Sequence, residues 1–226
     1  MKTFQLILDS RTRTSNNAYD ACFQLSKPIS RVQSVRVKFA QFANTLFNIA
    51  PGENILTLST GATLIIPPGF YTQTEFITLL QTICSVTYNS GKLIWTLGTV
   101  SIVTAATTMR EVIGLSLNNT YTGTFSSWLY LASPMNVDFS CNQINDTQGY
   151  IVYSGRDRTI NNQPFLSIPV TEGHGNMCFY SPHNMYHITI GNGSLSQLDF
   201  LICDSSSGRV LTELSHWSML LEVDCY

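Results

Sequence analysis

Ile55-Leu56-Thr57-Leu58 and Thr63-Leu64-Ile65-Ile66 are two short apolar stretches separated by the turn residues Ser59-Thr60-Gly61-Ala62. Two β-prone runs joined by a few residues that include Gly are typical of a β-hairpin. Pro67-Pro68-Gly69 follow directly. They end the second run, because Pro fixes its own φ and cannot donate a hydrogen bond to a ladder. The stretch therefore predicts an antiparallel hairpin followed by a sharp turn.

Two short helices are expected in the same part of the chain. Thr72-Gln73-Thr74-Glu75 has the spacing of a capping box, in which the Thr and Glu side chains each bond to the other residue's backbone N–H. Apolar residues then recur at helical spacing, at Phe76, Leu79, Leu80 and Ile83. Thr108-Met109-Arg110-Glu111 is a second capping box, which predicts a helix of one or two turns that stops at Gly114.

The remaining signals are those of β-strands. Apolar and polar residues alternate in the opening strand, and the exception is Ile7, an apolar residue on the face that is otherwise polar. Gly98-Thr99 is expected to be the turn of a second hairpin, and residues 118–124 and 142–149 are expected to be long polar loops. The further strand candidates are residues 3–9, 22–25, 32–42, 92–97, 100–104, 128–131, 150–154, 164–168, 186–190, 198–203 and 219–223. Many strands and few helices predict an all-β sandwich or barrel.

The composition is low in charge. Of the 226 residues, 44% are hydrophobic and only 12% are charged, whereas soluble domains average about 25% charged residues. Such a chain suits a protein whose surface is packed against partners, since interface cores are depleted of charge. The alternative is an ordinary β-domain with a neutral polar surface. The net charge of −2 leaves no overall basic footprint for nucleic acid.

The six cysteines lie far apart, at positions 22, 84, 141, 178, 203 and 225, and match no zinc module. Met1-Lys2-Thr3-Phe4 lacks the apolar region of a signal peptide. No apolar run approaches the length of a membrane span. We therefore expect synthesis in a reducing compartment, free and largely buried thiols, and no direct membrane insertion.

Several segments follow one another along the chain in a characteristic order. They include Asp9-Ser10-Arg11-Thr12-Arg13, Leu25-Ser26-Lys27-Pro28-Ile29, Phe42-Ala43-Asn44-Thr45-Leu46-Phe47-Asn48-Ile49, Ile66-Pro67-Pro68-Gly69-Phe70-Tyr71-Thr72 and Trp217-Ser218-Met219-Leu220-Leu221-Glu222-Val223. This order resembles that of the single-jelly-roll vertex (penton) and minor capsid proteins of double-stranded DNA viruses whose main capsid protein is a double jelly roll. These viruses include virophages, Polinton-like elements and nucleocytoplasmic large DNA viruses. The chain departs from the family pattern at Ala43-Asn44-Thr45, where Pro-Asn-Thr is usual, and at Ile113-Gly114-Leu115, where Leu-Gly-Phe is usual.

The resemblance implies one eight-stranded jelly-roll domain over residues 1–226. It also implies a structural capsid role in the virion, with assembly in the host cytoplasm. The implied partners are four further copies of the chain in a homopentamer, the major capsid protein and other minor capsid proteins. No enzymatic activity, cofactor or specific nucleic acid is implied. The residues we expect at subunit contacts are Phe42, Asn44, Phe47, Trp128, Arg11 and Arg13.

Several residues could carry chemistry instead. The best metal candidates are Glu172, His174, Cys178, His183 and His187, since imidazole and thiolate are good zinc ligands. Their spacing matches no known module, however, and loop His residues more often make ordinary hydrogen bonds, so we expect no metal. The four His include no pair of the cupin type, and no nucleophile elbow, P-loop or dinucleotide motif occurs. We expect no catalytic residue, although Cys/His catalysis stays open because such residues meet only in the fold.

Tryptophans and arginines give the remaining alternatives. Trp95 and Trp217 lie in apolar strands and are expected in the core, whereas Trp128 follows a polar segment and could contact a subunit or a glycan. Arg156-Asp157-Arg158 could pair with an acidic neighbour, could meet encapsidated DNA, or could simply compensate its own charges. The hypotheses kept beside the vertex subunit are a minor or cement capsid protein, a jelly-roll module that binds a receptor or glycan, and an enzyme with a Cys/His centre at residues 174–187.

Overall fold

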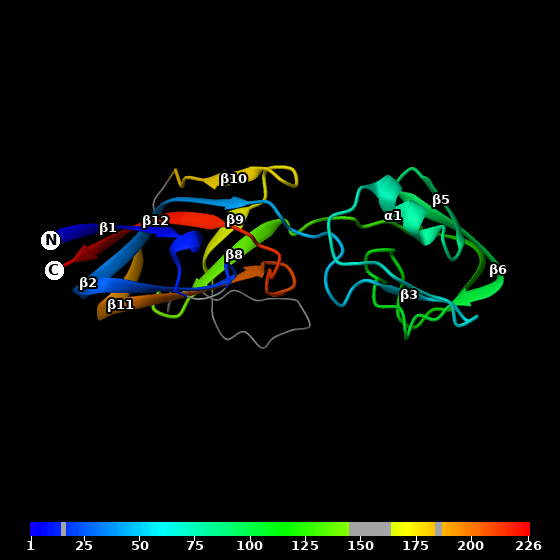
Figure 1. The fold of residues 1–226 in the computed structure, drawn as a ribbon, viewed down its shortest axis with the longest axis horizontal. Helices are drawn as coiled ribbons and strands as arrows, with labels where there is room; N and C mark the ends of the chain where they lie inside the picture. Colours follow the sequence, from blue (N-terminus) through cyan, green and yellow to red (C-terminus); the bar gives the residue numbers. More distant parts are fainter. Residues whose placement is uncertain (15–16, 145–163, 184–186) are drawn as a thin grey trace. The chain divides into compact units, whose positions relative to one another are not determined.

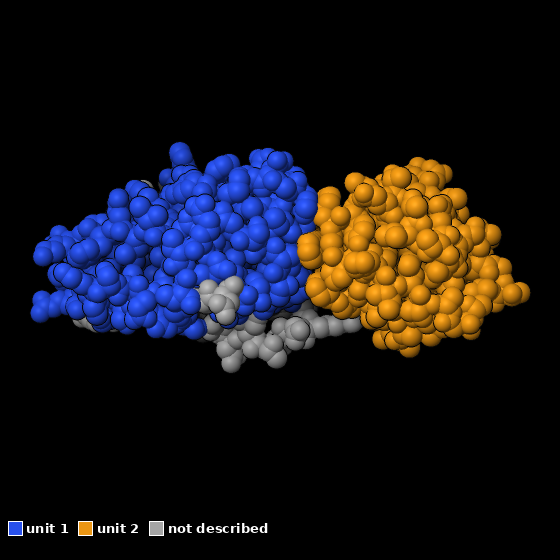
Figure 2. All heavy atoms as spheres, viewed as in Figure 1, with its two compact units in different colours: residues 1–46, 134–226 blue, residues 47–133 orange. Residues whose placement is uncertain are grey.

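The computed structural model describes residues 1–14, 17–144, 164–183 and 187–226, which fold into two compact units (Figures 1 and 2). Unit 1 comprises Met1–Leu46 and Pro134–Tyr226, and unit 2 comprises Phe47–Ser133. Each unit has a separate hydrophobic core made of its own side chains. The all-β class is confirmed. The division into two cores was not expected, and the single capsid domain over residues 1–226 stays a prediction.

Unit 1 contains one antiparallel sheet of seven strands in the order β1-β12-β2-β11-β8-β9, with β10 also paired to β2 (Figure 1). The strand candidates at 186–190 and 198–203 belong to one long strand, and the candidate at 150–154 lies outside the described residues. A 3-10 turn, η1 (Ser10–Thr12), follows the first strand. The strands are β1 (Lys2–Asp9), β2 (Asp20–Ala43), β8 (Asn136–Cys141), β9 (Pro164–Pro169), β10 (Met177–Tyr180), β11 (Ile188–Asp204) and β12 (Trp217–Cys225).

This sheet curls around its own core. The pairing of β11 with β2 shifts register three times, and β2 itself passes through a positive φ of 56° at Arg31. Bulges of this kind bend strands and increase their twist, so β2 and β11 each contribute to two walls of the core. Trp217 of β12 accordingly packs against rings from other strands, with centroids 5.6 Å from Phe23, 5.2 Å from Phe200 and 5.4 Å from Phe139. These aromatic contacts close the core of unit 1.

Unit 2 contains a hairpin, a helix and a three-stranded antiparallel sheet of order β5-β6-β7 (Figure 1). The hairpin of β3 and β4 confirms the prediction from residues 55–66. Trp95 and Phe76 are fully buried in the core of the unit, between the helix and the sheet strands. The elements are β3 (Ile55–Thr57), β4 (Thr63–Ile65), α1 (Gln73–Leu80), β5 (Ser85–Asn89), β6 (Lys92–Ile102) and β7 (Tyr121–Trp128).

The first capping box forms as predicted, and the second does not. Glu75 donates its backbone N–H to Thr72 Oγ1 at 3.3 Å, and Thr72 donates its own to the Glu75 carboxylate at 2.8 Å. The hydroxyl of Thr108 instead accepts from the backbone N–H groups of Asn54 and Ile55, at 3.1 and 3.0 Å. The helix expected there is replaced by hydrogen-bonded turns, because Thr108 is used to hold the start of β3.

The expected hairpin at Gly98-Thr99 is wrong. β6 runs straight through these residues, with Gly98 at a φ of 61° where the pairing with β7 shifts register between Thr96 and Ser101. The hairpin turn lies earlier, at Ser90 and Gly91, whose positive φ angles of 49° and 85° suit a two-residue turn between β5 and β6. Residues 118–124 were expected to form a loop, but the strand β7 begins within them, at Tyr121. β7 ends at Trp128, where the expected strand at 128–131 would have begun.

Candidate interaction surfaces

The outward face of unit 1 carries four apolar side chains in a row across the sheet. Ile7 of β1 pairs with Leu220 of β12, and Leu220 pairs with Phe39 of β2. The ring of Phe39 lies 6.3 Å from that of Phe179 on β10. Ile7 is 81% exposed and Phe179 is 61% exposed. We call Ile7, Phe39, Phe179 and Leu220 the apolar row. Exposed apolar side chains that adjoin one another are a mark of interaction surfaces.

A bulge in β2 sets the position of this row. Leu220 pairs with Phe39 and Leu221 with Val37, so Lys38 is an extra residue in β2. Side chains alternate between the faces of a strand. Val37 is buried, and without the bulge Phe39 would be buried too. The extra residue reverses the alternation, which turns Phe39 outward and places Phe42 in the core.

Two carboxylates lie beside the apolar row on the same face. Glu222, whose side chain is only 9% exposed, accepts from Arg36 Nε at 2.6 Å and lies 3.6 Å from Lys38 Nζ. Burial alone would raise the pKa of Glu222, but hydrogen bonds from Arg36 and Gln5 and the nearby positive charges hold that pKa below its usual value. Charge on this face is thus compensated within the unit, and the apolar row is left as its exposed feature.

Asp224 is the second of these carboxylates and is almost fully buried. It accepts from the hydroxyl groups of Thr3 at 2.8 Å and Ser34 at 3.3 Å. His187 Nδ1 lies 3.8 Å from the same carboxylate. This network joins β1, β2, β12 and the start of β11, and it accounts for a buried acid without a metal ion.

The other exposed aromatic residue of interest is Trp128, at the end of β7 in unit 2. Its side chain is 51% exposed, and Lys92 Nζ lies 4.7 Å from the ring centroid. Cation–π contacts of this kind hold an aromatic ring in one orientation. Trp95 and Trp217 are fully buried, with their indole N–H groups bonded to Ser127 and to the carbonyl of Ala18, so their predicted core positions are confirmed.

The structure places the six predicted contact residues differently. Phe42 is fully buried in the core of unit 1, and Asn44 is 3% exposed, with its amide donating to the Glu172 carbonyl at 2.7 Å. Both residues support the interior of the unit, and their role at a subunit contact stays a prediction. Phe47 is partly buried. Trp128 is exposed, and its contact role stays a prediction.

The two arginines lie after β1. Arg11 is exposed but pairs with Asp9, donating from Nη2 to Oδ2 at 2.5 Å and from Nε to Oδ1 at 3.0 Å. This partner lowers the pKa of Asp9 from 3.8 to about 2. Arg13 is partly buried and donates to the carbonyl of Ser10. Both arginines stabilise the turn η1, and their contact role stays a prediction. Arg156 and Arg158 lie outside the described residues.

The five metal candidates do not gather into one site. Cys178 is buried in the core on β10, His174 and His183 are exposed, and His187 lies beside Asp224 and Arg36. Within the described ranges, no three His, Cys, Asp or Glu residues lie in a group that could hold a metal ion. Burial raises the pKa of the Cys141 thiol to about 11 and that of Cys203 to about 12. Such buried thiols are unreactive.

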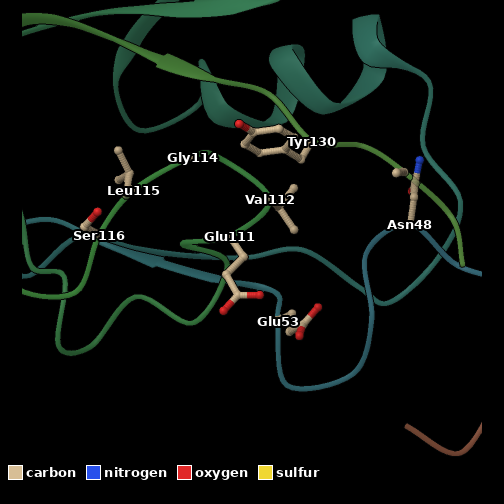
Figure 3. A pocket seen from close by; sticks show the side chains of 9 residues that line it. Asn48, Glu53, Glu111, Val112, Gly114, Leu115, Ser116 and Tyr130 are labelled. Carbon is tan, nitrogen blue, oxygen red and sulfur yellow. The ribbon is translucent and has the colours of Figure 1, made fainter. Parts of the chain in front are cut away.

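Unit 2 contains a pocket lined by two glutamates and a tyrosine among other residues (Figure 3). Figure 3 shows the carboxylates of Glu53 and Glu111 on one side and the ring of Tyr130 on the other. The lining residues include neither His, Cys nor Lys. The residues that line the pocket are Asn48, Glu53, Glu111, Val112, Gly114, Leu115, Ser116, Tyr130 and Ala132. It offers no nucleophile paired with a base.

Two solved structures match this chain over nearly its whole length. A crystal structure of the mavirus penton protein matches with a TM-score of 0.50 and 10% sequence identity, covering 100% of both chains. A cryo-electron microscopy structure of the Sputnik virophage matches with a TM-score of 0.45 and 11% identity, covering 99% of this chain and 98% of that chain. No family model and no curated protein matches the sequence. The chain is therefore an all-β protein of the jelly-roll type, and the fold expected from the resemblance is confirmed.

Proposed function

We propose that the chain is a structural capsid protein, the penton subunit that closes the five-fold vertices of an icosahedral shell as a homopentamer. The observation that carries the proposal is the match to the mavirus penton protein, which spans all of both chains. A match of this extent includes unit 2 as well as the sheet of unit 1, so both units have counterparts in a vertex protein.

The surface chemistry supports the same role. A closed ring needs heterologous contacts, in which two different patches of each subunit meet. The apolar row on unit 1 and the exposed Trp128 on unit 2 are two such patches. A chain that is only 12% charged has few charged side chains to desolvate when these patches are covered.

The proposed partners are the other four copies of the chain, the major capsid protein and other minor capsid proteins. The site of action is the virion, after assembly in the host cytoplasm. The role is geometric, so it requires neither catalysis, a cofactor nor specific nucleic acid. In the described ranges, every helix falls short of the length and hydrophobicity needed to cross a membrane.

Light scattering of the purified protein, with negative-stain imaging of the same sample, tests this proposal. We expect particles of five chains, each of 25.2 kDa, that appear as five-fold rings. A clean monomer would raise the minor or cement capsid role to equal standing, because a vertex protein can require the shell in order to assemble. A stable trimer would contradict the penton proposal.

A second candidate is a module that binds a receptor or glycan. The observation in its favour is the half-exposed ring of Trp128, oriented by Lys92 and surrounded on β7 by hydroxyl side chains. Sugars stack on such rings through their apolar faces. A glycan array separates the two candidates: binding that Trp128→Ala abolishes would support the module, and a blank array would support the capsid role alone.

A further inference from the structure

The first strand, β1, leaves one edge of the sheet of unit 1 open. Among the described residues, β1 pairs with β12 on one side only and ends the strand order. Along such an edge, alternate backbone N–H and C=O groups point away from the sheet and can pair with another strand. The opposite end of the sheet differs, because β9 begins and ends with Pro164 and Pro169. Proline guards edges by removing a donor, and β1 contains none.

The core-facing side of β1 is also incompletely covered. Leu8 is 3% exposed, whereas Phe4, four residues earlier on the same side of the strand, is 41% exposed. Phe4 and the partly buried Leu6 line a groove together with Leu25 of β2. A strand added beside β1 would bring every second side chain to this groove, since side chains alternate in extended chains. One extended chain could therefore pair its backbone with the open edge of β1 and place its alternate side chains in the groove.

The rim of the groove is positively charged. Lys2, Lys27 and Arg31 line it, and none of its described lining residues is Asp or Glu. All three cations are exposed. None of the three takes part in an ion pair within the part of the chain that the structure describes. Elsewhere in unit 1, Arg11, Arg36 and Arg209 are each paired with a carboxylate. The rim therefore favours a partner that carries negative charge.

We propose that the β1 edge is a docking site for an acidic, extended segment of another protein, which adds as a strand and places alternate apolar side chains over Phe4 and Leu6. Backbone hydrogen bonds supply affinity in this mode of recognition, and the groove and rim supply specificity. The site does not depend on the vertex role, since it uses one edge of one unit and requires no ring.

A labelled eight-residue peptide, Glu-Thr-Val-Thr-Val-Thr-Glu-Thr, tests the proposal on the full-length protein. Its Val and Glu side chains lie on the same side of an extended strand, so Val can cover Phe4 and Leu6 while Glu meets the rim of the same groove; we call it the Val-Glu peptide. We expect saturable binding by fluorescence anisotropy and, in hydrogen exchange, slower exchange of the β1 amides when the peptide is present. A peptide with Lys in place of Glu should bind at least tenfold more weakly. A Val-Glu peptide with alternate backbone amides methylated should lose binding, because it cannot complete the ladder.

Variants locate the site. Lys27→Glu should weaken binding at least fivefold, because it reverses one of the three positive charges at the rim of the groove. Lys27 is exposed, so the fold should tolerate the change. Lys92→Glu, the same charge change in unit 2, should leave binding unchanged. Circular dichroism checks that both variants are folded. Unchanged exchange at β1, or equal binding of the Val-Lys peptide, would overturn the proposal.

The same samples separate this proposal from the vertex role. If β1 is already protected in the protein alone, and the protection increases with protein concentration, the occupant is a second copy of the chain and the acidic-peptide proposal fails. Particle mass by light scattering is recorded in parallel. A pentamer that does not bind the peptide overturns only the docking site, and a monomer that binds it contradicts only the ring.

Discussion

A Cβ atom at Gly114 would lie 2.4 Å from the carbonyl oxygen of Trp128 and 2.8 Å from its backbone nitrogen. No side chain fits in that space. Gly114 also has a φ of 66° and ends the turn that begins at Met109, with the N–H of Leu115 bonded to the carbonyl of Arg110 at 2.8 Å. This is the Schellman arrangement, which requires a left-handed residue. One glycine therefore ends the turn and lets β7 pass beside it.

Gly114→Ala should destabilise unit 2 by about 2–5 kcal/mol. The left-handed conformation costs a residue with a Cβ about 1–2 kcal/mol, and the clash with the Trp128 backbone adds an overpacking cost of about 1–3 kcal/mol. Urea unfolding measures the loss. Gly61→Ala is the matched control, since Gly61 has a φ of 86° but nothing within 4 Å of the added atom. Equal losses in the two variants would refute the clash.

Arg36→Ala should cost about 1.5–3 kcal/mol, the range for hydrogen bonds to charged groups. It leaves the nearly buried Glu222 with the longer contacts to Gln5 at 3.3 Å and Lys38 at 3.6 Å. Lys38→Ala is the control and should cost less than about 1 kcal/mol, as exposed pairs do. The pKa of Glu222 is lowered from 4.5, so its contribution is present above that pH and is lost as the pH falls through the lowered value. Unfolding at several pH values should show a smaller loss in Arg36→Ala. An unchanged pH slope would contradict this role.

Local patterns in the sequence were enough to predict several elements. The reciprocal bonds of Thr72 and Glu75 depend on residues three positions apart, and so does their signature in sequence. The hairpin β3–β4 is equally local. β7 could have been found from the alternation of Tyr121, Gly123 and Phe125, but its polar residues favoured a loop.

The bulge at Lys38 and the division into two units could not be predicted, because both depend on pairing between residues distant in sequence. Alternation from Val35 and Val37 places Phe39 inside, and only the register of β12 reverses it. The full burial of Phe42 was not foreseen for this reason, and most of the apolar row went unrecognised. Ile7 did carry a signal, since it breaks the alternation of β1. No local pattern in the sequence indicates which segments contribute to the core of unit 1 and which contribute to the core of unit 2.

Iodoacetamide at pH 8 should label Cys22 first in the folded protein, because Cys141, Cys178, Cys203 and Cys225 are buried. Cys84 is partly exposed like Cys22, but burial raises the pKa of its thiol to about 11, so it should react more slowly. Burial, with the charges of Asp138 and Asp204 in addition, raises the pKa of Cys203 to about 12, so almost no thiolate exists there at pH 8. Mass spectrometry with time measures the order. Cys22→Ser should remove the fast phase, and labelling of Cys203 as rapid as that of Cys22 would contradict the burial.

Arg11→Ala should raise the pKa of Asp9 from about 2 toward 3.8, because the hydrogen bonds from Arg11 are the main cause of the shift. The lowered pKa means that Asp9 stabilises the fold above pH 3.8 and loses this effect as the pH falls toward 2. Carboxyl NMR titration measures the change. Arg11→Lys keeps the charge without the two-pronged contact and should give an intermediate pKa. If the pKa of Asp9 in Arg11→Ala equals that in the unmodified protein, a group other than Arg11 lowers it.

Trp128→Ala should weaken assembly while leaving the subunit folded. The ring is half exposed and contacts the exposed end of Lys92, whereas the core of unit 2 depends on Trp95. Removal of an exposed side chain changes stability by about 0.5 kcal/mol or less, but loss of an aromatic anchor from an interface typically costs about 2 kcal/mol or more of binding energy. Light scattering across a dilution series should therefore show the oligomer dissociating at higher concentration than the unmodified protein. Tyr88→Ala, on β5 of the same sheet and 37% exposed, is the matched control. If the particle mass of Trp128→Ala stays unchanged on dilution, the Trp128 side chain is not at a subunit contact. The pentamer must then close through the apolar row and other surfaces.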